Sequence, residues 1–559
     1  MSLFGLLGKT MKKLIVFYSI ILLSWINQLS CQVEHIPIYH PVYRFLLHCE
    51  TKGLLPNFSL SSLPLQKKEI VDALKKIRSD SSLNSSSDIA ILDAFEMEFN
   101  IKKRENAVLF YSKSDSIQLI PEKLFTNDEK FIYHYIDETS ECSLVPLVSW
   151  DNIFNIISNN LDNVGLGNLG IRLNGTIDNK LGYFLKITNG QILYGNRNLA
   201  FKDNRLRYNV KFSELNSDFD FSESHIRLDL DWFYAFTGRE NRLLGAGINQ
   251  YVFLSDNAPP FDAIGLGVQS KTFEYRFTFG SLIALNESCV PNGKDAIIPP
   301  KYISMHRFAF KPSWGELALW ENVIYSNRNP DLAYLIPLSF LKNIEHTLHD
   351  RDNTMLGFDI TVRPLSGIQL KGSFLLDDVV FSEIGKGFWH NKFAWNIAMI
   401  LSLPLSFDIA FEYSRVEPFT FSHFNNQNSM TNDSLIFGGY LKPNSDQFAM
   451  NLFWFYGARY PLELKLTYTR HGDNIKDKNG NVIKNVGGDP LLSKRSEDAY
   501  YYTFLDGDRT DILDFQINAG LQIVRGIDLM LKIDLSKSSK SDLETGFRIT
   551  ISIGNPNDY

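Results

Sequence analysis

The chain has 559 residues, of which 44% are hydrophobic and 13% aromatic, so it carries ample apolar surface for a large folded unit and is not a disordered chain. Its 56 basic and 63 acidic residues give a formal net charge of −7. Because no basic excess exists to neutralise phosphates, the composition argues against a nucleic-acid partner.

The N-terminus has the pattern of a signal peptide. Lys12 and Lys13 precede an apolar stretch over residues 14–26, and a short polar run then ends at Cys31. The apolar stretch is too short for a transmembrane helix, which needs about 20 residues. We therefore assign residues 1–31 to a signal peptide. Lipid attachment at Cys31 is the less favoured alternative, because Gln28 stands where lipoprotein signals carry an aliphatic residue.

Residues 35–105 are predicted to form a small domain of three helices. An apolar stripe at helical spacing covers residues 70–77. Gly53 is placed to end an earlier helix, and Asp88 is placed to cap a later one. Because the domain follows the signal peptide directly, we expect it on the periplasmic side of a membrane.

The cysteines leave two alternatives open. A disulfide between Cys49 and Cys142 would suit an oxidising periplasm, and two unpaired, partly buried thiols would suit the sequence equally well. No CxxC pair and no cysteine spacing typical of a metal site is present.

From about Leu166 the hydrophobic period changes from helical spacing to two. In residues 354–364, for example, Leu356, Phe358 and Ile360 fall on one face and polar residues on the other. Soluble sheets alternate in the same way, but these strands are about 10 to 12 residues long, and very short turns alternate with long polar loops. This rhythm is typical of an outer-membrane β-barrel.

The strand count implies one strand that lies before Leu166. We count about seventeen strands from there onwards, whereas bacterial barrels have an even number with both termini in the periplasm. The additional strand is expected between residues 106 and 150, with 107–111 and 143–149 as candidates. The predicted fold is therefore all-β: a transmembrane antiparallel β-barrel of about 18 strands over residues 106–559, with a small N-terminal helical domain.

The sequence contains no nucleotide-binding loop, GxSxG elbow, HExxH helix or cysteine cluster, so we predict no enzymatic activity, catalytic residue, metal or cofactor. His346 and His349 have the i, i+3 spacing of a surface metal site, and a solvated loop is the simpler interpretation. The residues that follow Asp477 partly match a calcium loop. A turn at Asn479 and Gly480 explains them more simply.

A spaced set of residues lies between about Asp256 and Asp378: His306, Arg307, Glu321, Asp352, Asn353, Asp359, Asp377 and Asp378. This set resembles the pattern of the Wzi family of capsule-assembly outer-membrane proteins. The helical N-terminal segment also looks like the extension of the longer members. The resemblance implies an eighteen-stranded outer-membrane barrel that binds capsular polysaccharide at the cell surface.

We therefore predict a non-enzymatic outer-membrane barrel that binds and helps to attach or assemble capsular or extracellular polysaccharide. A porin or substrate-specific channel is the alternative, because a polar lumen suits both functions, and a barrel hydrolase ranks third. The expected partners are surface polysaccharide, outer-membrane lipid with lipopolysaccharide, and the barrel assembly machinery.

Ligand contacts are expected on the long extracellular loops, because the periplasmic turns are too short to form a binding surface. Aromatic rings can stack on the apolar faces of sugars, and two loops carry such residues. The candidate ligand-binding residues are Phe388, Trp389, His390, Tyr500, Tyr501 and Tyr502.

Overall fold

The computed structural model describes residues 32–80, 85–99, 101, 107–113, 116–157, 160–207, 209–213, 215–287, 297–349, 351–457 and 459–554. The predicted signal peptide at 1–31 lies outside the described residues. Among the helices within these ranges, none is both long enough and apolar enough to cross a bilayer.

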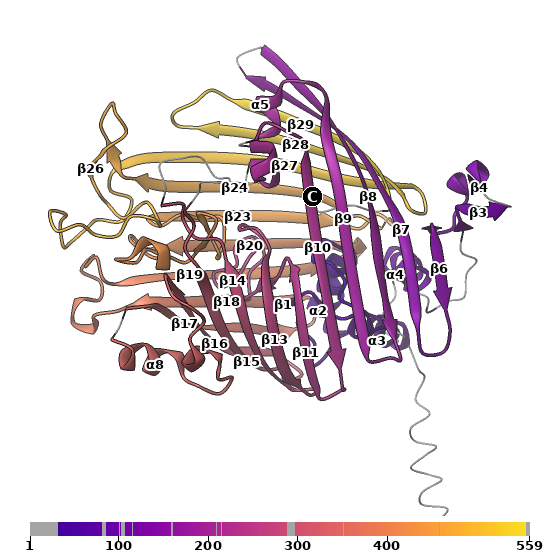
Figure 1. Cartoon of the computed structure of the whole chain (residues 1–559), viewed down its shortest axis with the longest axis horizontal. Coiled ribbons are helices and arrows are strands. Elements are labelled where there is room, and N and C mark those ends of the chain that lie inside the picture. Colours follow the sequence, from indigo (N-terminus) through magenta and orange to yellow (C-terminus); the bar gives the residue numbers. More distant parts are fainter. Residues whose placement is uncertain are drawn as a thin grey trace, which may run out of the picture.

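Within the described residues, eighteen long antiparallel strands form a closed barrel (Figure 1), which confirms the predicted fold class. In chain order the strands are β7 (Glu141–Ile157), β8 (Asn160–Ile177), β9 (Leu181–Gly195), β10 (Phe219–Asp229), β11 (Phe233–Glu240), β13 (Phe261–Gln269), β14 (Phe273–Leu282), β15 (Lys301–Phe310), β16 (Gly315–Ser326), β17 (Asn353–Leu365), β18 (Ile368–Asp378), β19 (Lys392–Leu403), β20 (Phe407–Val416), β23 (Ser445–Trp454), β24 (Leu462–Asp473), β27 (Asp508–Val524), β28 (Ile527–Ser538) and β29 (Glu544–Ile553). The last strand closes the barrel by pairing with the first, from Glu544 opposite Ile157 to Ile553 opposite Val148.

The strand that the even count required is β7, which contains the candidate segment 143–149. The other candidate, 107–111, overlaps β2 (Ala107–Val108) and β3 (Phe110–Lys113). These two pair outside the barrel, with β5 (Lys130–Phe131) and β4 (Ser116–Leu119) respectively. The short β6 (Tyr133–Ile136) pairs with the first residues of β7, beyond the end of β29.

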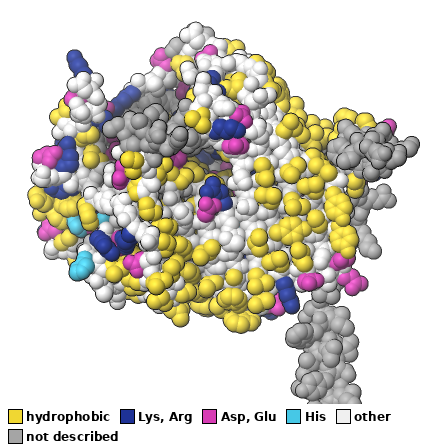
Figure 2. All heavy atoms as spheres, in the orientation of Figure 1, with side chains coloured by type: hydrophobic (Ala, Val, Ile, Leu, Met, Phe, Trp, Pro, Cys, Tyr) yellow, Lys and Arg dark blue, Asp and Glu magenta, His cyan; other side chains and the backbone are white. Residues whose placement is uncertain are grey.

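The barrel is apolar outside and polar inside. On β17, Phe358 is 47% exposed on the outer face, whereas its neighbour Asp359 is 2% exposed and faces inwards. Figure 2 shows hydrophobic side chains gathered over the outer face of β7, β8 and β9. An apolar outer band of this kind is typical of barrels that contact lipid.

Short turns and long loops lie at opposite ends of the strands, as predicted. Two-residue turns centred on Gly367 and Gly526 join β17 to β18 and β27 to β28, and both glycines have the positive φ that such turns require (84° and 78°). At the other end, residues 417–444 connect β20 to β23 and residues 474–507 connect β24 to β27. The connections hold the short elements β12 (Leu243–Leu244), β21 (Thr431–Asn432), β22 (Leu435–Ile436), β25 (Ile475–Lys476), β26 (Val482–Lys484), α5 (Arg197–Ala200), α6 (Asn204–Arg207), α7 (Val210–Ser213) and α8 (Leu341–Thr347).

The N-terminal region forms three helices, α2 (Val42–Thr51), α3 (Lys67–Ser79) and α4 (Ser86–Glu98), at the short-turn end of the barrel (Figure 1). Their apolar residues share one core with barrel residues. These are Ala398, Ile400, Ala410 and Phe453 on the strands, and Phe455 directly after β23. The inner barrel wall therefore supplies part of the core against which the apolar stripes of the helices pack. We call residues 32–99 the plug.

Two local predictions for the plug have different outcomes. Gly53, just after α2, has a φ of +81°, as expected of a residue that ends a helix. Asp88 is not the N-cap of α4, because the helix begins earlier and the side chain of Ser85 accepts the N–H of Asp88. The carboxylate of Asp88 instead contacts the side chains of Lys52 and Ser406.

The cysteine alternatives are resolved in favour of unpaired thiols. Cys49 is buried in α2, Cys142 lies on β7, and both are free. No disulfide joins the plug to the barrel through these two residues.

Candidate functional site

The loop between β11 and β13, residues 241–260, folds into the barrel and is called the inner loop here. Its element β12 pairs with β1 (Ser62–Leu63) of the plug. The backbone N–H groups of Asn249 and Gln250 donate to the carboxylate of Glu412 on β20, at 2.6 and 3.2 Å. The inner loop therefore joins the plug to the opposite wall and divides the lumen.

One side of the divided lumen is filled with apolar side chains. The rings of Phe253 on the inner loop and Trp320 on β16 stack with their centroids 3.9 Å apart. Phe421, Met430 and Phe437 of the 417–444 loop belong to the same buried cluster.

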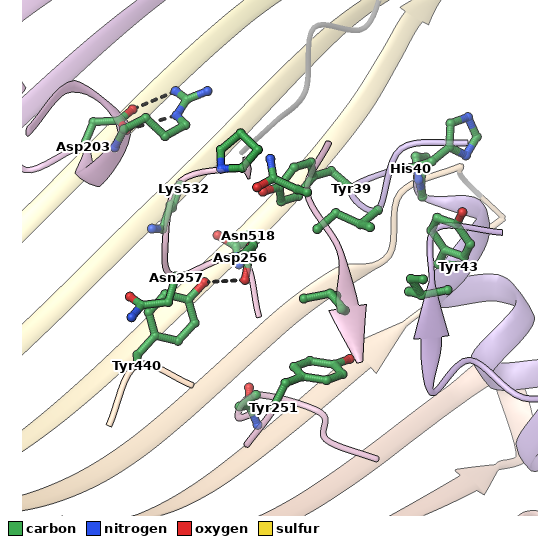
Figure 3. Close-up of a pocket in the computed structure, with 18 of the residues that line it drawn as sticks. Tyr39, His40, Tyr43, Asp203, Tyr251, Asp256, Asn257, Tyr440, Asn518 and Lys532 are labelled. Carbon is green, nitrogen blue, oxygen red and sulfur yellow. Dashed lines mark hydrogen bonds and ion pairs between the residues drawn. The ribbon is translucent and has the colours of Figure 1, made fainter. Parts of the chain in front are cut away.

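The other side of the lumen holds a cavity of about 1160 Å³, which we call the vestibule. Its lining extends from Tyr39 and Tyr43 of the plug to Asp203, Asp256 and Tyr440 on the long loops. Figure 3 shows tyrosines of the plug and the inner loop facing the same space as polar residues of the barrel wall. Plug residues line the vestibule towards the short-turn end of the barrel.

The wall of the vestibule is a ladder of polar side chains across β24, β27, β28 and β29. The register places Glu463 beside Asn518, Asn518 beside Lys532, and Lys532 beside Arg548. Neighbouring strands lie about 4.8 Å apart, so the ladder offers hydrogen-bonding groups at regular intervals.

The two loop segments nominated from the sequence meet in one cluster. The backbone N–H of Trp389 donates to the carbonyl oxygen of Tyr500 at 2.9 Å, and Phe388 and Tyr501 form an isolated β-bridge. The Lys494 ammonium lies 4.1 Å from the centroid of the Tyr500 ring. We call Phe388, Trp389, His390, Tyr500, Tyr501, Tyr502 and Lys494 the rim cluster.

The rim cluster is anchored at its base and open at its tip. Tyr502 packs edge-on against the buried Phe419, with centroids 5.0 Å apart, and His390 lies 2.5 Å from the carboxylate of Asp378. Tyr500 and Tyr501 are 58% and 56% exposed. The cluster therefore presents aromatic faces to solvent from a fixed base.

Four of the residues that carry the family resemblance lie in two pairs. Arg307 lies 3.4 Å from Asp359 and 2.6 Å from Glu316 on the inner wall. His306 lies 3.3 Å from Glu321 on the outer face, which these two residues share with Phe308 and Leu319, and there Glu321 accepts the N–H of Leu341 of α8. These pairs are buried and so are not an exposed binding surface.

The other residues that carry the resemblance form hydrogen bonds and ion pairs with residues of the long loops. Asp352 binds Arg328 and the hydroxyl of Tyr334, and Asn353 donates to the carbonyl oxygen of Asn428 at 2.9 Å. Asp377 accepts the N–H of Phe421 at 2.7 Å. Only its neighbour Asp378 reaches the rim cluster, through His390.

One group of side chains has the composition of a metal site: His35 of the plug, His225 on β10 and Glu240 on β11. The Nδ1 atoms of both histidines lie 3.1 Å from the Glu240 carboxylate. However, the backbone N–H of His35 donates to Nε2 of His225, and Arg227 donates to Nε2 of His35. Each ring must therefore carry its proton on Nδ1, where a metal would have to bind.

Burial lowers the pKa of His35 to about 3, so its ring is neutral at physiological pH. Glu240 also lies 3.1 Å from Arg242, a cation that further disfavours a second positive charge. The group is a hydrogen-bonded contact that fastens the plug to the barrel.

The other two candidate metal sites have simple local structures. His346 lies in α8 and His349 lies two residues after its end, and they belong to no metal-type group among the described residues. The Asp477 carboxylate accepts the backbone N–H groups of Asn479 and Asn481, and Gly480 has a φ of 85°. This segment is the predicted turn.

Taken together, fold and interior define a closed eighteen-stranded barrel with an internal plug. No protein-family model matches the sequence. No curated protein matches it either. Among solved structures, the chain is similar to Wzi of Escherichia coli, described as a carbohydrate-binding outer-membrane β-barrel involved in group 1 capsule assembly, with a TM-score of 0.56 and 12% identity over 94% of this chain and 99% of that one.

The similarity to Wzi confirms the predicted resemblance at the level of the fold. Two barrels of Pseudomonas aeruginosa also match: OprD, with a TM-score of 0.41 and 9% identity over 74% of this chain and 92% of that one, and OccK11, with 0.40 and 10% over 74% and 95%. Their weaker superposition supports no conclusion about this chain.

The vestibule was missed by reasoning from the sequence. Tyr39 lies in the plug, which the sequence placed outside the barrel, and Tyr251 lies in a loop with no signal for folding inwards. Only the inward-facing polar residues of the strands, such as Lys532, indicated a lumen that could hold a polar ligand.

Proposed function

We propose that this protein is a non-enzymatic outer-membrane barrel that binds capsular or extracellular polysaccharide and helps to attach or assemble it at the cell surface. The observation that carries the proposal is the rim cluster, in which two loops more than a hundred residues apart in sequence combine into one aromatic surface. Exposed aromatic faces beside a cation and polar loops suit sugar rings, which stack on their apolar face and hydrogen-bond at their edge.

The interior argues against the alternative function of a porin. The plug shares its core with the barrel wall, and the inner loop is hydrogen-bonded across the lumen. A general pore needs a continuous water-filled path. A protein that binds a polymer at the outer surface of the cell does not need such a path.

The fold that this chain shares with Wzi is consistent with the proposal, since that protein is described as a carbohydrate-binding barrel. In this arrangement the apolar outer band would contact outer-membrane lipid and lipopolysaccharide, after insertion by the barrel assembly machinery. The plug and short turns would face the periplasm, and the rim cluster would face outwards. We assign no catalytic role to any residue.

Deletion of the gene tests this proposal. Binding through many weak contacts predicts that polysaccharide is still made but is released into the medium. Cell-bound and released polymer are measured separately after gentle centrifugation. A deletion strain that keeps all of its cell-bound polysaccharide and instead loses uptake of a small solute would replace this proposal with the porin function.

A further inference from the structure

We propose that the vestibule is a second binding site, separate from the rim cluster, that takes a short segment of an acidic glycan. This inference rests on the proposed function and names a ligand class for it. The site lies inside the barrel, between the plug and the polar ladder of β24 to β29.

The first support is that the vestibule has aromatic side chains on one side and polar side chains on the other. Tyr39, Tyr251 and Tyr440 lie on the plug and the loops, and the ladder with Asn518 and Lys532 lies on the barrel wall (Figure 3). Sugar-binding sites commonly combine aromatic faces with a small number of fixed polar groups. The cavity of about 1160 Å³ is above the usual range for small-molecule sites, and so has room for more than one sugar ring.

The second support is that several polar groups lining the cavity are not engaged. The hydroxyls of Tyr39 and Tyr251 have no hydrogen-bond partner within the described part of the chain. Lys465 on β24 and its register partner Gln516 on β27 also have no hydrogen bond or ion pair among the described residues. Such groups bind water or a ligand, because leaving them unsatisfied is unfavourable.

The third support concerns charge. The two carboxylates that act electrostatically on Lys465 are already engaged. Glu412 accepts the N–H groups of the inner loop, and Glu463 accepts the side chain of Asn518 and lies 3.6 Å from Arg44. Among the described residues of β24 to β29 that line the vestibule, the ammonium of Lys465 therefore has no direct ion-pair partner, whereas Lys532 and Arg548 have one. A carboxylate on a sugar ring would pair with the Lys465 ammonium, and this selects an acidic glycan over a neutral one.

The test uses the purified full-length protein in detergent and oligogalacturonates as acidic probes, with maltooligosaccharides as neutral controls. We expect calorimetry to show binding of the oligogalacturonates at least about tenfold tighter than that of the neutral sugars, and weaker at higher salt. Equal binding of the two sugars, or no binding, would overturn the inference.

Substitutions then locate the site. Lys465→Gln should weaken oligogalacturonate binding about tenfold, because one charge-assisted contact is lost. Tyr251→Ala should weaken it as well, whereas Lys478→Gln, on an exposed turn, should leave it unchanged. A heat-modifiable gel shift shows that each variant is folded. Wild-type affinity in a folded Lys465→Gln variant would contradict the assignment.

Two further measurements separate this inference from related ones. Trp389→Ala alters the rim cluster and should still bind oligogalacturonate. If rim variants release polymer from cells but the wild-type protein ignores the acidic probe, the vestibule inference fails and the proposed function stands. Fragments of the cell's own surface polysaccharide should displace the probe. Displacement only by the lipopolysaccharide core oligosaccharide would overturn our choice of ligand.

Discussion

The backbone N–H of Trp389 donates to the carbonyl oxygen of Tyr500 across two loops that the chain separates by more than a hundred residues. This hydrogen bond fixes the distance between the two aromatic segments before any ligand arrives. A ligand that stacks on both rings therefore does not need to order the loops, and preorganisation of this kind favours binding.

Loss of one ring should weaken polymer retention. Trp389→Ala or Tyr500→Ala is expected to shift polysaccharide from the cell surface to the medium, because a stacked aromatic contact contributes about 1 kcal/mol at each of many repeated sites. The ratio of bound to released polymer measures the effect. Phe424→Ala is the matched control, since Phe424 is 72% exposed on a loop but lies outside the rim cluster. An unchanged ratio in both rim variants would refute the role of the cluster.

The intact protein should not form a large, stable channel in planar bilayers, because the plug and the inner loop occupy the lumen. A variant that lacks residues 32–99 should conduct, provided that a heat-modifiable gel shift shows a closed barrel. A large steady conductance of the full-length protein would contradict the closed interior.

Removing one partner of a buried ion pair should destabilise the protein strongly. Arg363 on β17 lies 2.7 Å from Glu50 of α2, and both side chains are almost completely buried. Glu50→Ala leaves the Arg363 charge without its partner, which costs about 3 kcal/mol. Thermal unfolding in detergent measures the loss. The double variant Glu50→Leu, Arg363→Met should recover much of it, and a single variant as stable as wild type would show that the pair contributes little.

Docking of the plug should depend on pH through His48. Burial disfavours the charged ring, but hydrogen bonds to Asp408 and Asp88 outweigh it and raise the pKa of His48 from 6.5 to about 8. Because the folded pKa is the higher one, this stabilisation is fully present below about pH 6.5 and is lost as the pH rises through 8. Its size is about 2 kcal/mol.

Melting temperatures between pH 6 and pH 9 test this pH dependence. His48→Gln should flatten the profile over that range, whereas His349→Gln, in an exposed loop, should leave it as in the wild type. A wild-type profile without a fall near pH 8 would exclude His48 as its source.

The barrel could be predicted from the sequence because its strands alternate with a strict period. Phe358 and Asp359 face opposite sides, and every slip by one residue would expose charge to lipid, so the pattern is unambiguous. The even strand count then required one earlier strand and left two candidate segments, of which 143–149 lies inside β7 and 107–111 lies outside the barrel. Local signals also identified the plug helices and the positive φ at Gly53.

The interior could not be predicted, because it depends on contacts between distant segments. Nothing local to residues 241–260 shows that Asn249 will bond to Glu412, and nothing in the plug shows that its core includes Phe453. The rim cluster was predicted only as two separate loop segments. The two segments come together through backbone hydrogen bonds between the loops, and such bonds leave no periodic signal in the sequence.

The plug touches the barrel on several sides at once: Glu34 binds Thr176 on β8, Glu50 binds Arg363 on β17, and His48 binds Asp408 on β20. These contacts connect strands on different sides of the barrel through the plug. A barrel without them could flatten into an ellipse as the surrounding bilayer changes thickness. With them, any flattening would have to stretch a buried ion pair on one side or compress the helical core on the other, so the cross-section stays rigid and the spacing of the outer loops stays constant.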